Sequence, residues 1–93
     1  GVTYDTTSEQ LRKALDIAND VYANHRNTQS TVVSFNKFGD FALNIQIVHW
    51  HNPAAWADYV KSIEEMNLEL KKRFDSEGID FAFPTQTVYL KQE

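Results

Sequence analysis

His49 and His51 have the one spacing in the chain that is typical of a metal site. On a β-strand, residues two apart point to the same face, so both imidazoles could bind one cation. A firm zinc site needs a third and usually a fourth ligand, and the sequence offers only the distant His25 and the surrounding acids. We therefore expect two ordinary histidines near a strand end, with no bound metal and no cofactor. A metal- or small-ligand-binding module that uses the face of His49 and His51 stays open as the alternative.

The sequence lacks the common motifs of enzymes, so we expect no catalytic residues. No Gly-x-Ser-x-Gly motif presents a nucleophile. Glu64 and Glu65 are neighbours on a predicted helix, where adjacent side chains point about 100° apart and do not converge. None of Gly1, Gly39 and Gly78 opens a helix, which excludes a glycine-rich phosphate loop.

The composition indicates one small domain that does not bind nucleic acid. A length of 93 residues fits a single domain, and a net charge of −4 disfavours contact with phosphate backbones. The absence of cysteine excludes disulfides and thiolate metal sites. No window approaches the about 18 consecutive apolar residues that span a bilayer. If the chain is part of a membrane protein, the membrane part must lie outside it.

The first half of the chain predicts a strand, a helix and a β-hairpin. Residues 2–4 favour a strand, and the pairs Thr6–Glu9 and Thr7–Gln10 both have the spacing of a capping box at a helix start. Apolar residues then recur every three or four positions, which indicates an amphipathic helix that fades at residues 24–27. A loop at residues 27–30 and a strand at residues 31–38 should follow. After a turn at Gly39-Asp40, one strand face should carry Phe41, Leu43, Ile45 and Ile47.

The second half predicts a helix and a strand. Asn52-Pro53 is typical of a helix start, and Gly78 is typical of a helix end. Asn67 lies within the apolar stripe of this helix, so we expect its amide to bond to the backbone of the sheet or of a loop. Leu68 lies off the stripe, which makes it a candidate contact. Residues 79–83 should form a strand that ends at Pro84, and residues 85–90 are a further β-prone run. The apolar stripe consists of Trp56, Tyr59, Val60, Ile63, Leu70 and Phe74.

This order of elements predicts an α+β fold of the ferredoxin-like βαββαβ type, with two helices on one face of a mainly antiparallel sheet. We expect a folding unit over residues 1–84 and a tail over residues 85–93. The tail offers too little apolar surface to be buried alone, and a lone strand tends to recruit another chain. The predicted core consists of Leu15, Val33, Ile45, Ile47, Trp56, Ile63 and Phe74.

Several short motifs, in this order and spacing, resemble the C-terminal α/β region of the small-conductance mechanosensitive channel (MscS-like) family. They are Tyr4-Asp5-Thr6-Thr7, Phe38-Gly39-Asp40, Leu43-Asn44-Ile45, Gly78-Ile79 and Phe83-Pro84. The resemblance covers nearly the whole chain. The stretch Phe81-Ala82-Phe83 is bulkier than the more polar versions found in this family.

The resemblance implies a subunit of a homo-oligomeric channel, usually a heptamer, that opens under membrane tension during osmotic stress. In that family this region forms part of a vestibule with side portals on the cytoplasmic side of the cell membrane, where it filters ions. The transmembrane and middle β domains of the same chain lie upstream. The matching tail segment closes a parallel β-barrel with one strand per subunit. The expected oligomer contacts are therefore Gln86, Val88 and Leu90, together with the off-stripe Leu68.

Overall fold

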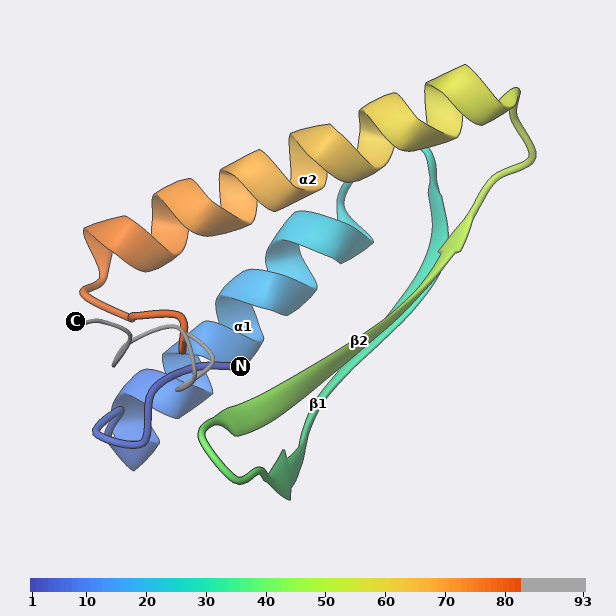
Figure 1. Cartoon of the computed structure of the whole chain (residues 1–93). Helices are drawn as coiled ribbons and strands as arrows, with labels where there is room; N and C mark the ends of the chain where they lie inside the picture. Colours follow the sequence, from blue (N-terminus) through green and yellow to red (C-terminus); the bar gives the residue numbers. More distant parts are fainter. Residues whose placement is uncertain (83–93) are drawn as a thin grey trace, which may run out of the picture.

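A computed structural model of the chain describes residues 1–82. Two helices and two strands follow one another in the order α1 (Ser8–Ala23), β1 (Thr28–Phe38), β2 (Leu43–His51) and α2 (Trp56–Ser76). Both helices lie on the same side of the antiparallel sheet that β1 and β2 form (Figure 1). The predicted α+β class, with two helices on one face, is confirmed. The predicted end of the last strand at Phe83 and Pro84, and the tail after it, lie outside the described residues.

The start of α1 is fixed by a capping box, as predicted. The Gln10 backbone N–H donates to Thr7 Oγ1, and the Thr7 N–H donates to Gln10 Oε1, each at 3.1 Å. Of the two candidate boxes, the chain uses this one, because the Thr6 N–H is already bonded to the Thr3 carbonyl. The helix ends at Ala23, where the amphipathic pattern fades. Its buried residues are Ala14, Ala18, Val21 and Tyr22.

The hairpin of β1 and β2 differs from the prediction at both ends. Its first strand begins earlier, and its turn is longer. The strand β1 begins at Thr28 because Thr28 pairs with His51 and the Asn52 N–H donates to the Asn27 carbonyl. The expected loop at residues 27–30 is therefore mostly strand. At the turn, the Gly39 N–H donates to the Ala42 carbonyl, so β2 begins only after that residue. Phe41 lies in this turn and is 58% exposed, so its predicted place on the inner face of β2 is wrong.

The helix α2 begins three residues later than the sequence predicts. Its N-cap is Ala55, which offers no side-chain hydrogen bond, whereas Asn52 belongs to the end of the hairpin. The first buried residue of α2 is Ser62, so the first turns of the helix lie beyond the core. Trp56 is 75% exposed, and its prediction as a core residue is wrong.

The end of α2 is the Schellman motif that Gly78 predicts. Gly78 has φ +71°, a conformation that favours glycine. The Ile79 N–H donates to the Phe74 carbonyl at 3.0 Å, and the Gly78 N–H donates to the Asp75 carbonyl at 3.2 Å. This turn sends the chain back under the helix, where Ile79 is buried and Phe81 stacks on Phe74 with ring centroids 5.1 Å apart.

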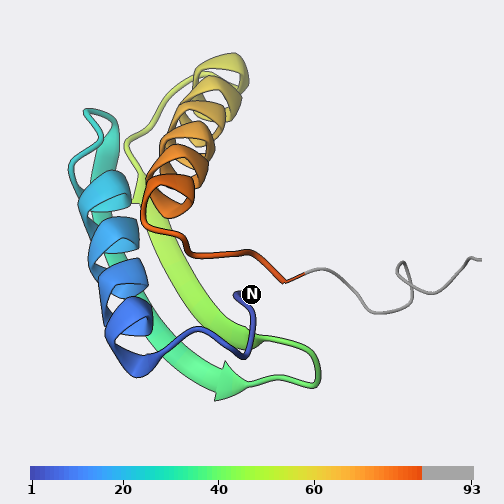
Figure 2. The same cartoon turned by 90° about the vertical axis from the view of Figure 1, so that its left-hand side faces the viewer.

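Within residues 1–82, the strands predicted at residues 2–4 and 79–83 are reduced to two isolated bridges on the free side of β2. Val2 pairs antiparallel with Leu43 on one side and with Phe81 on the other. The spatial order is therefore β1, β2, Val2 and Phe81, which is the order of a split βαβ sandwich. Figure 2 shows the chain near residue 1 between β2 and the segment that follows α2.

The core consists of two clusters along the inner face of the sheet. The first contains Val2, Ala14, Leu43, Phe74 and Ile79, and the second contains Val21, Tyr22 and Met66. Of the predicted core, Phe74 is buried, while the remaining members apart from Trp56 are half-buried: Leu15, Val33, Ile45, Ile47 and Ile63. Neither described helix is long and apolar enough to cross a membrane.

Candidate functional site

Three histidines lie at the end of the domain where β2 stops. His49 and His51 are on the inner face of β2, with ring centroids 6.0 Å apart. His25 comes from the turn between α1 and β1. The ring of Tyr22 lies edge-on to His49, and the ring of Tyr59 lies edge-on to His51. The histidine cluster, defined as His25, His49 and His51, thus comes from the turn before β1 and the end of β2, and a tyrosine of each helix flanks it.

The hydrogen bonds of the histidine cluster direct its nitrogens to different partners. His25 Nδ1 accepts from the Asn27 N–H, so Nε2 carries the hydrogen and donates to Glu65 at 2.9 Å. His51 Nδ1 lies 2.6 Å from the Asn52 carbonyl oxygen, which can only accept. These bonds anchor the turn before β1 to α2 and the end of β2 to its own loop.

His49 contacts the first residue of β1, Thr28. Its Nε2 lies 2.7 Å from Thr28 Oγ1. His51 Nε2 is buried and has no hydrogen-bond partner among the described residues. Within residues 1–82, no group of three or more His, Cys, Asp or Glu side chains is placed to hold a metal ion.

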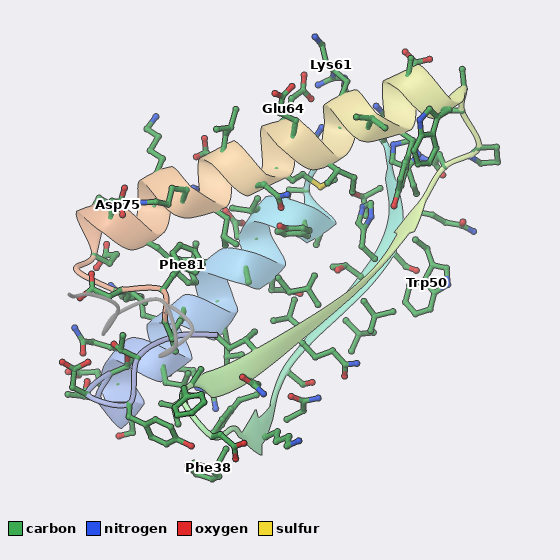
Figure 3. The ribbon with its side chains drawn as sticks, viewed as in Figure 1. Phe38, Trp50, Lys61, Glu64, Asp75 and Phe81 are labelled. Atoms are coloured by element: carbon green, nitrogen blue, oxygen red, sulfur yellow. The ribbon has the colours of Figure 1, made fainter. Side chains whose placement is uncertain are left out.

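The charge of the cluster is set by burial and by mutual repulsion. Burial lowers the pKa of His49, and the nearby His51 and His25 lower it further. The hydrogen bond from His25, supported by Arg26, lowers the pKa of Glu65. A neutral His49 and an ionised Glu65 are therefore the favoured states near neutral pH. Glu64 points away from this site on the outer side of α2, so the two adjacent glutamates do not converge (Figure 3).

A polar seam, defined by the pairs Tyr22–Asn67, Asn27–Ser62 and Asp20–Arg73, joins α1 and its following turn to α2. Burial raises the pKa of Tyr22, and its hydroxyl donates to Asn67 Oδ1. Asn27 Nδ2 donates to the buried Ser62 Oγ at 3.0 Å, and Arg73 donates to Asp20 Oδ2 at 2.6 Å. Asn67 is exposed and has a side chain as its partner, so the predicted bond to a backbone group is wrong.

The sheet presents an apolar patch on the face that no helix covers. Val32 and Val48 are direct cross-strand partners, and Trp50 follows two residues later on the same face. Val32 is 54% exposed and Trp50 is 49% exposed. Trp50 points away from both helices (Figure 3). We name Val32, Val48 and Trp50 the outer patch. The outer patch can be recognised in the sequence of β2, because the outer-face residues after Gln46 are apolar, whereas those up to Gln46 are polar.

The expected oligomer contacts are only partly within the described residues. Leu68 lies on the outer side of α2 and is 64% exposed, as its position off the stripe predicts. It is separated from the outer patch by the whole thickness of the domain, because helices and sheet form two layers (Figure 2). Gln86, Val88 and Leu90 lie outside the described residues, so their role as contacts stays a prediction.

Comparison with known proteins identifies close relatives of the chain. Residues 1–81 match the family described as "Mechanosensitive ion channel MscS, C-terminal". The chain is 41% identical to the large-conductance mechanosensitive channel MscMJLR and 35% identical to the small-conductance mechanosensitive channel MscMJ, both from Methanocaldococcus jannaschii. Each alignment covers all of this chain and 27% of the relative. The low conductance mechanosensitive channel YnaI of Escherichia coli is 36% identical over 67% of this chain and 18% of its own length. No solved structure matches the chain significantly.

Proposed function

Because this chain belongs to the mechanosensitive ion channel MscS family, as its C-terminal part, we propose that it is the cytoplasmic end of a tension-gated channel subunit. The match over residues 1–81 carries this proposal, with two named channels aligned over the full chain. Since the chain spans 27% of those relatives, the pore must be supplied by other parts of the same protein. The role of this domain would be to build a vestibule that ions cross during osmotic stress.

The proposed vestibule requires several copies of the domain around one axis. Closed rings are the common form of homo-oligomers, and a heptamer is the form we propose. The outer patch and Leu68 lie on opposite layers of the domain, so one copy can contact two neighbours through different surfaces. Gln86, Val88 and Leu90 would add a strand from each subunit. The upstream transmembrane and middle β domains of the same chain are the remaining partners.

The charge of the domain suits the filtering of ions. A net charge of −4 on each copy of this domain is multiplied by the number of copies in a ring. Acidic residues that line a portal attract cations and repel anions, because a narrow passage focuses the field of its walls. We propose that the ring enriches cations near the pore. The family is one of ion channels and not of enzymes.

The test uses the full-length gene in a bacterial strain that lacks its own mechanosensitive channels. We expect the full-length protein to give stretch-activated currents in patches and to protect cells from hypo-osmotic shock. Native mass spectrometry should give seven subunits. A matched variant with Leu68→Ser should keep the fold and weaken the oligomer, whereas Lys61→Ser, on the same exposed side of α2, should leave it unchanged. A full-length protein that is monomeric and gives no stretch-activated current would contradict the proposal.

A further inference from the structure

The strand β2 has a free edge along most of its length. Leu43 exchanges two backbone bonds with Val2, since the Val2 N–H donates to the Leu43 carbonyl at 3.0 Å and the Leu43 N–H donates to the Val2 carbonyl at 2.9 Å. In a strand the N–H and C=O of one residue point to the same side, and successive residues alternate. The backbone groups of Ile45, Ile47 and His49 therefore point to the same edge as those of Leu43. Within residues 1–82 they have no hydrogen-bond partner.

The other set of backbone groups on β2 points toward β1. The Asn52 N–H donates to the carbonyl of Asn27, which directly precedes β1. Even-numbered residues of β2 thus bond to the hairpin partner, while odd-numbered ones face the free edge. An unpaired edge of this length is costly inside a domain and recruits another strand.

An apolar groove of about 180 Å³ lies beside this free edge. Ile45 and Ile47 of β2 form one wall, and Leu70 and Phe74 of α2 form the opposite wall. Gly1 and Val2 also line the groove. The walls are apolar side chains that are only half-buried, apart from Phe74. Covering them would remove apolar surface from water and so add to the core.

The chain at its first residues already runs into this groove. The Ala82 N–H donates to the Gly1 carbonyl at 2.9 Å, and the Thr3 N–H donates to the Asp80 carbonyl at 3.1 Å. Residues 1–3 are therefore paired on both sides, with β2 and with residues 80–82. In Figure 2 the N-terminal end lies beside β2 and beneath the segment that leaves α2.

We propose that the free edge of β2 and the apolar groove bind a β-strand formed by the about five residues directly upstream of Gly1 in the full-length protein. The relatives extend far beyond the matched part, and that part is C-terminal, so such residues are available. The proposal rests on this family membership and not on channel activity.

The antiparallel pairing of Val2 with Leu43 sets the register of the added strand. Each step upstream from Val2 moves one residue forward along β2. The first, third and fifth residues upstream of Gly1 therefore lie opposite Ile45, Ile47 and His49. Because Val2 is buried, these three side chains share its inner face and should be apolar. The second and fourth residues should lie on the outer face.

A consequence concerns how the domain is joined to the rest of the subunit. The polypeptide from upstream would enter as a central strand of the sheet, bonded to β2 on one side. A force applied to that polypeptide would act on all of its backbone hydrogen bonds to β2 at once. The domain would thus be held to the upstream part by sheet bonds and core packing.

A cysteine pair in the full-length protein tests the register directly. Gln46 lies on the outer face, and the second residue upstream of Gly1 should lie opposite it as a non-hydrogen-bonded pair, with Cα atoms about 4.5 Å apart. This separation is within the range that a disulfide spans. We expect Gln46→Cys with a cysteine at the upstream position to form a disulfide within one chain under mild oxidation. The matched control is Ser34→Cys, because Ser34 pairs with Gln46 on β1 and lies one strand further away.

Each outcome of the cross-linking bears on the proposal. Preferential cross-linking of the Gln46 pair, found by mass spectrometry within a single chain, supports it. Preferential cross-linking of the Ser34 pair would place the segment on the other edge of the hairpin and overturn the proposal. A disulfide between two chains would mean that a neighbouring copy supplies the strand, which also overturns it. So would the absence of either cross-link in variants that keep the circular dichroism spectrum of the parent.

Hydrogen exchange of the full-length protein gives a test that needs no substitution. If the strand is present, the amides of Ile45, Ile47 and His49 should exchange as slowly as those of Gln46 and Val48. If the edge is free, the odd-numbered amides should exchange faster, by at least tenfold, while the even-numbered ones stay protected by β1. That alternation in the full-length protein would overturn the proposal.

Discussion

The two ends of the sheet are held together by different chemistry. At the end near Leu43, the five buried apolar residues come from five separate segments: Val2, Ala14, Leu43, Phe74 and Ile79. At the end near His51, the buried apolar cluster is Val21, Tyr22 and Met66, and the histidine cluster and the polar seam surround it. The first end is stabilised mainly by apolar burial, and the second depends on directed hydrogen bonds.

This difference indicates that the domain is unevenly stable. Apolar burial does not depend on exact geometry, whereas a hydrogen bond contributes only about 0.5–1.5 kcal/mol net and is lost when its partner moves. The start of α2, which lies at the histidine end, also has no side-chain cap and exposes Trp56. We therefore expect local opening to begin at the histidine end and the apolar end to open last.

The largest effect should come from the apolar end. Phe74→Ala removes a buried ring that packs on Phe81 and on the first core cluster, and we expect a loss of about 3–5 kcal/mol in the free energy of unfolding. Urea denaturation followed by circular dichroism measures it. The matched change at the histidine end is Met66→Ala, for which we expect a smaller loss, of about 2–3 kcal/mol, because polar neighbours can close around the site. Equal losses would remove the distinction between the two ends.

The next effect concerns the two faces of β2. Ile45 packs against the first core cluster and lines the apolar groove, so Ile45→Ala should lower the free energy of unfolding by about 2 kcal/mol. Gln46, its neighbour on the outer face, is exposed. The control Gln46→Ala should change the value by less than about 0.5 kcal/mol. A larger effect at Gln46 than at Ile45 would mean that the register of β2 is off by one residue.

Structural features that depend only on residues close in sequence were predictable from the sequence. The capping box of Thr7 with Gln10 and the left-handed Gly78 depend on neighbours two to five residues away, and the structure contains both. The alternation of Leu43, Ile45 and Ile47 likewise set the inner face of β2. Local physics is enough for each of these, because the partner is nearby in sequence whatever the rest of the fold does.

Features that depend on distant segments were not predictable in the same way. Helical periodicity places Trp56 on the stripe of Phe74, but the packing of distant segments decides that the first buried residue of α2 is Ser62. Asn67 was expected to need a backbone partner, and a tyrosine 45 positions earlier supplies the bond. The spacing of His49 and His51 is readable in the sequence. Their neighbourhood is not, because Thr28, which contacts His49, and Glu65, which contacts His25, are distant in the chain and are brought close only by the fold.

A smaller effect should come from the start of α1, which lies at the apolar end. Thr7→Ala removes the hydroxyl that accepts the hydrogen bond of the Gln10 N–H, while the backbone N–H that donates to Gln10 Oε1 stays, and it should cost about 1 kcal/mol in the free energy of unfolding. Thr6→Ala, at the candidate box that the chain does not use, should cost clearly less. Thermal unfolding of both variants measures the difference. If Thr6→Ala is the more costly change, the helix begins one residue earlier than the structure places it.

The smallest effect is a pH dependence confined to the histidine end. The pKa of His49 in the folded chain lies below its ordinary value of about 6.5. As the pH falls below about 6.5, the unfolded chain binds a proton at this position before the folded chain does, so the free energy of unfolding decreases. The decrease ends once the pH is below the folded pKa, and above about 6.5 this residue contributes no slope.

Two variants separate this contribution from those of other groups. His49→Gln removes the titrating imidazole and should flatten the slope that sets in as the pH falls below about 6.5. Thr28→Val removes the hydroxyl partner of His49 and keeps the imidazole, so its slope should persist although its overall stability falls. The lowered pKa of Glu65 acts in a different window, because stability that comes from an ionised carboxylate is lost only below about pH 4.5. Urea denaturation at a series of pH values measures all three proteins. If His49→Gln keeps the slope of the parent, the pH dependence arises elsewhere, and the contrast between the two ends would rest on packing alone.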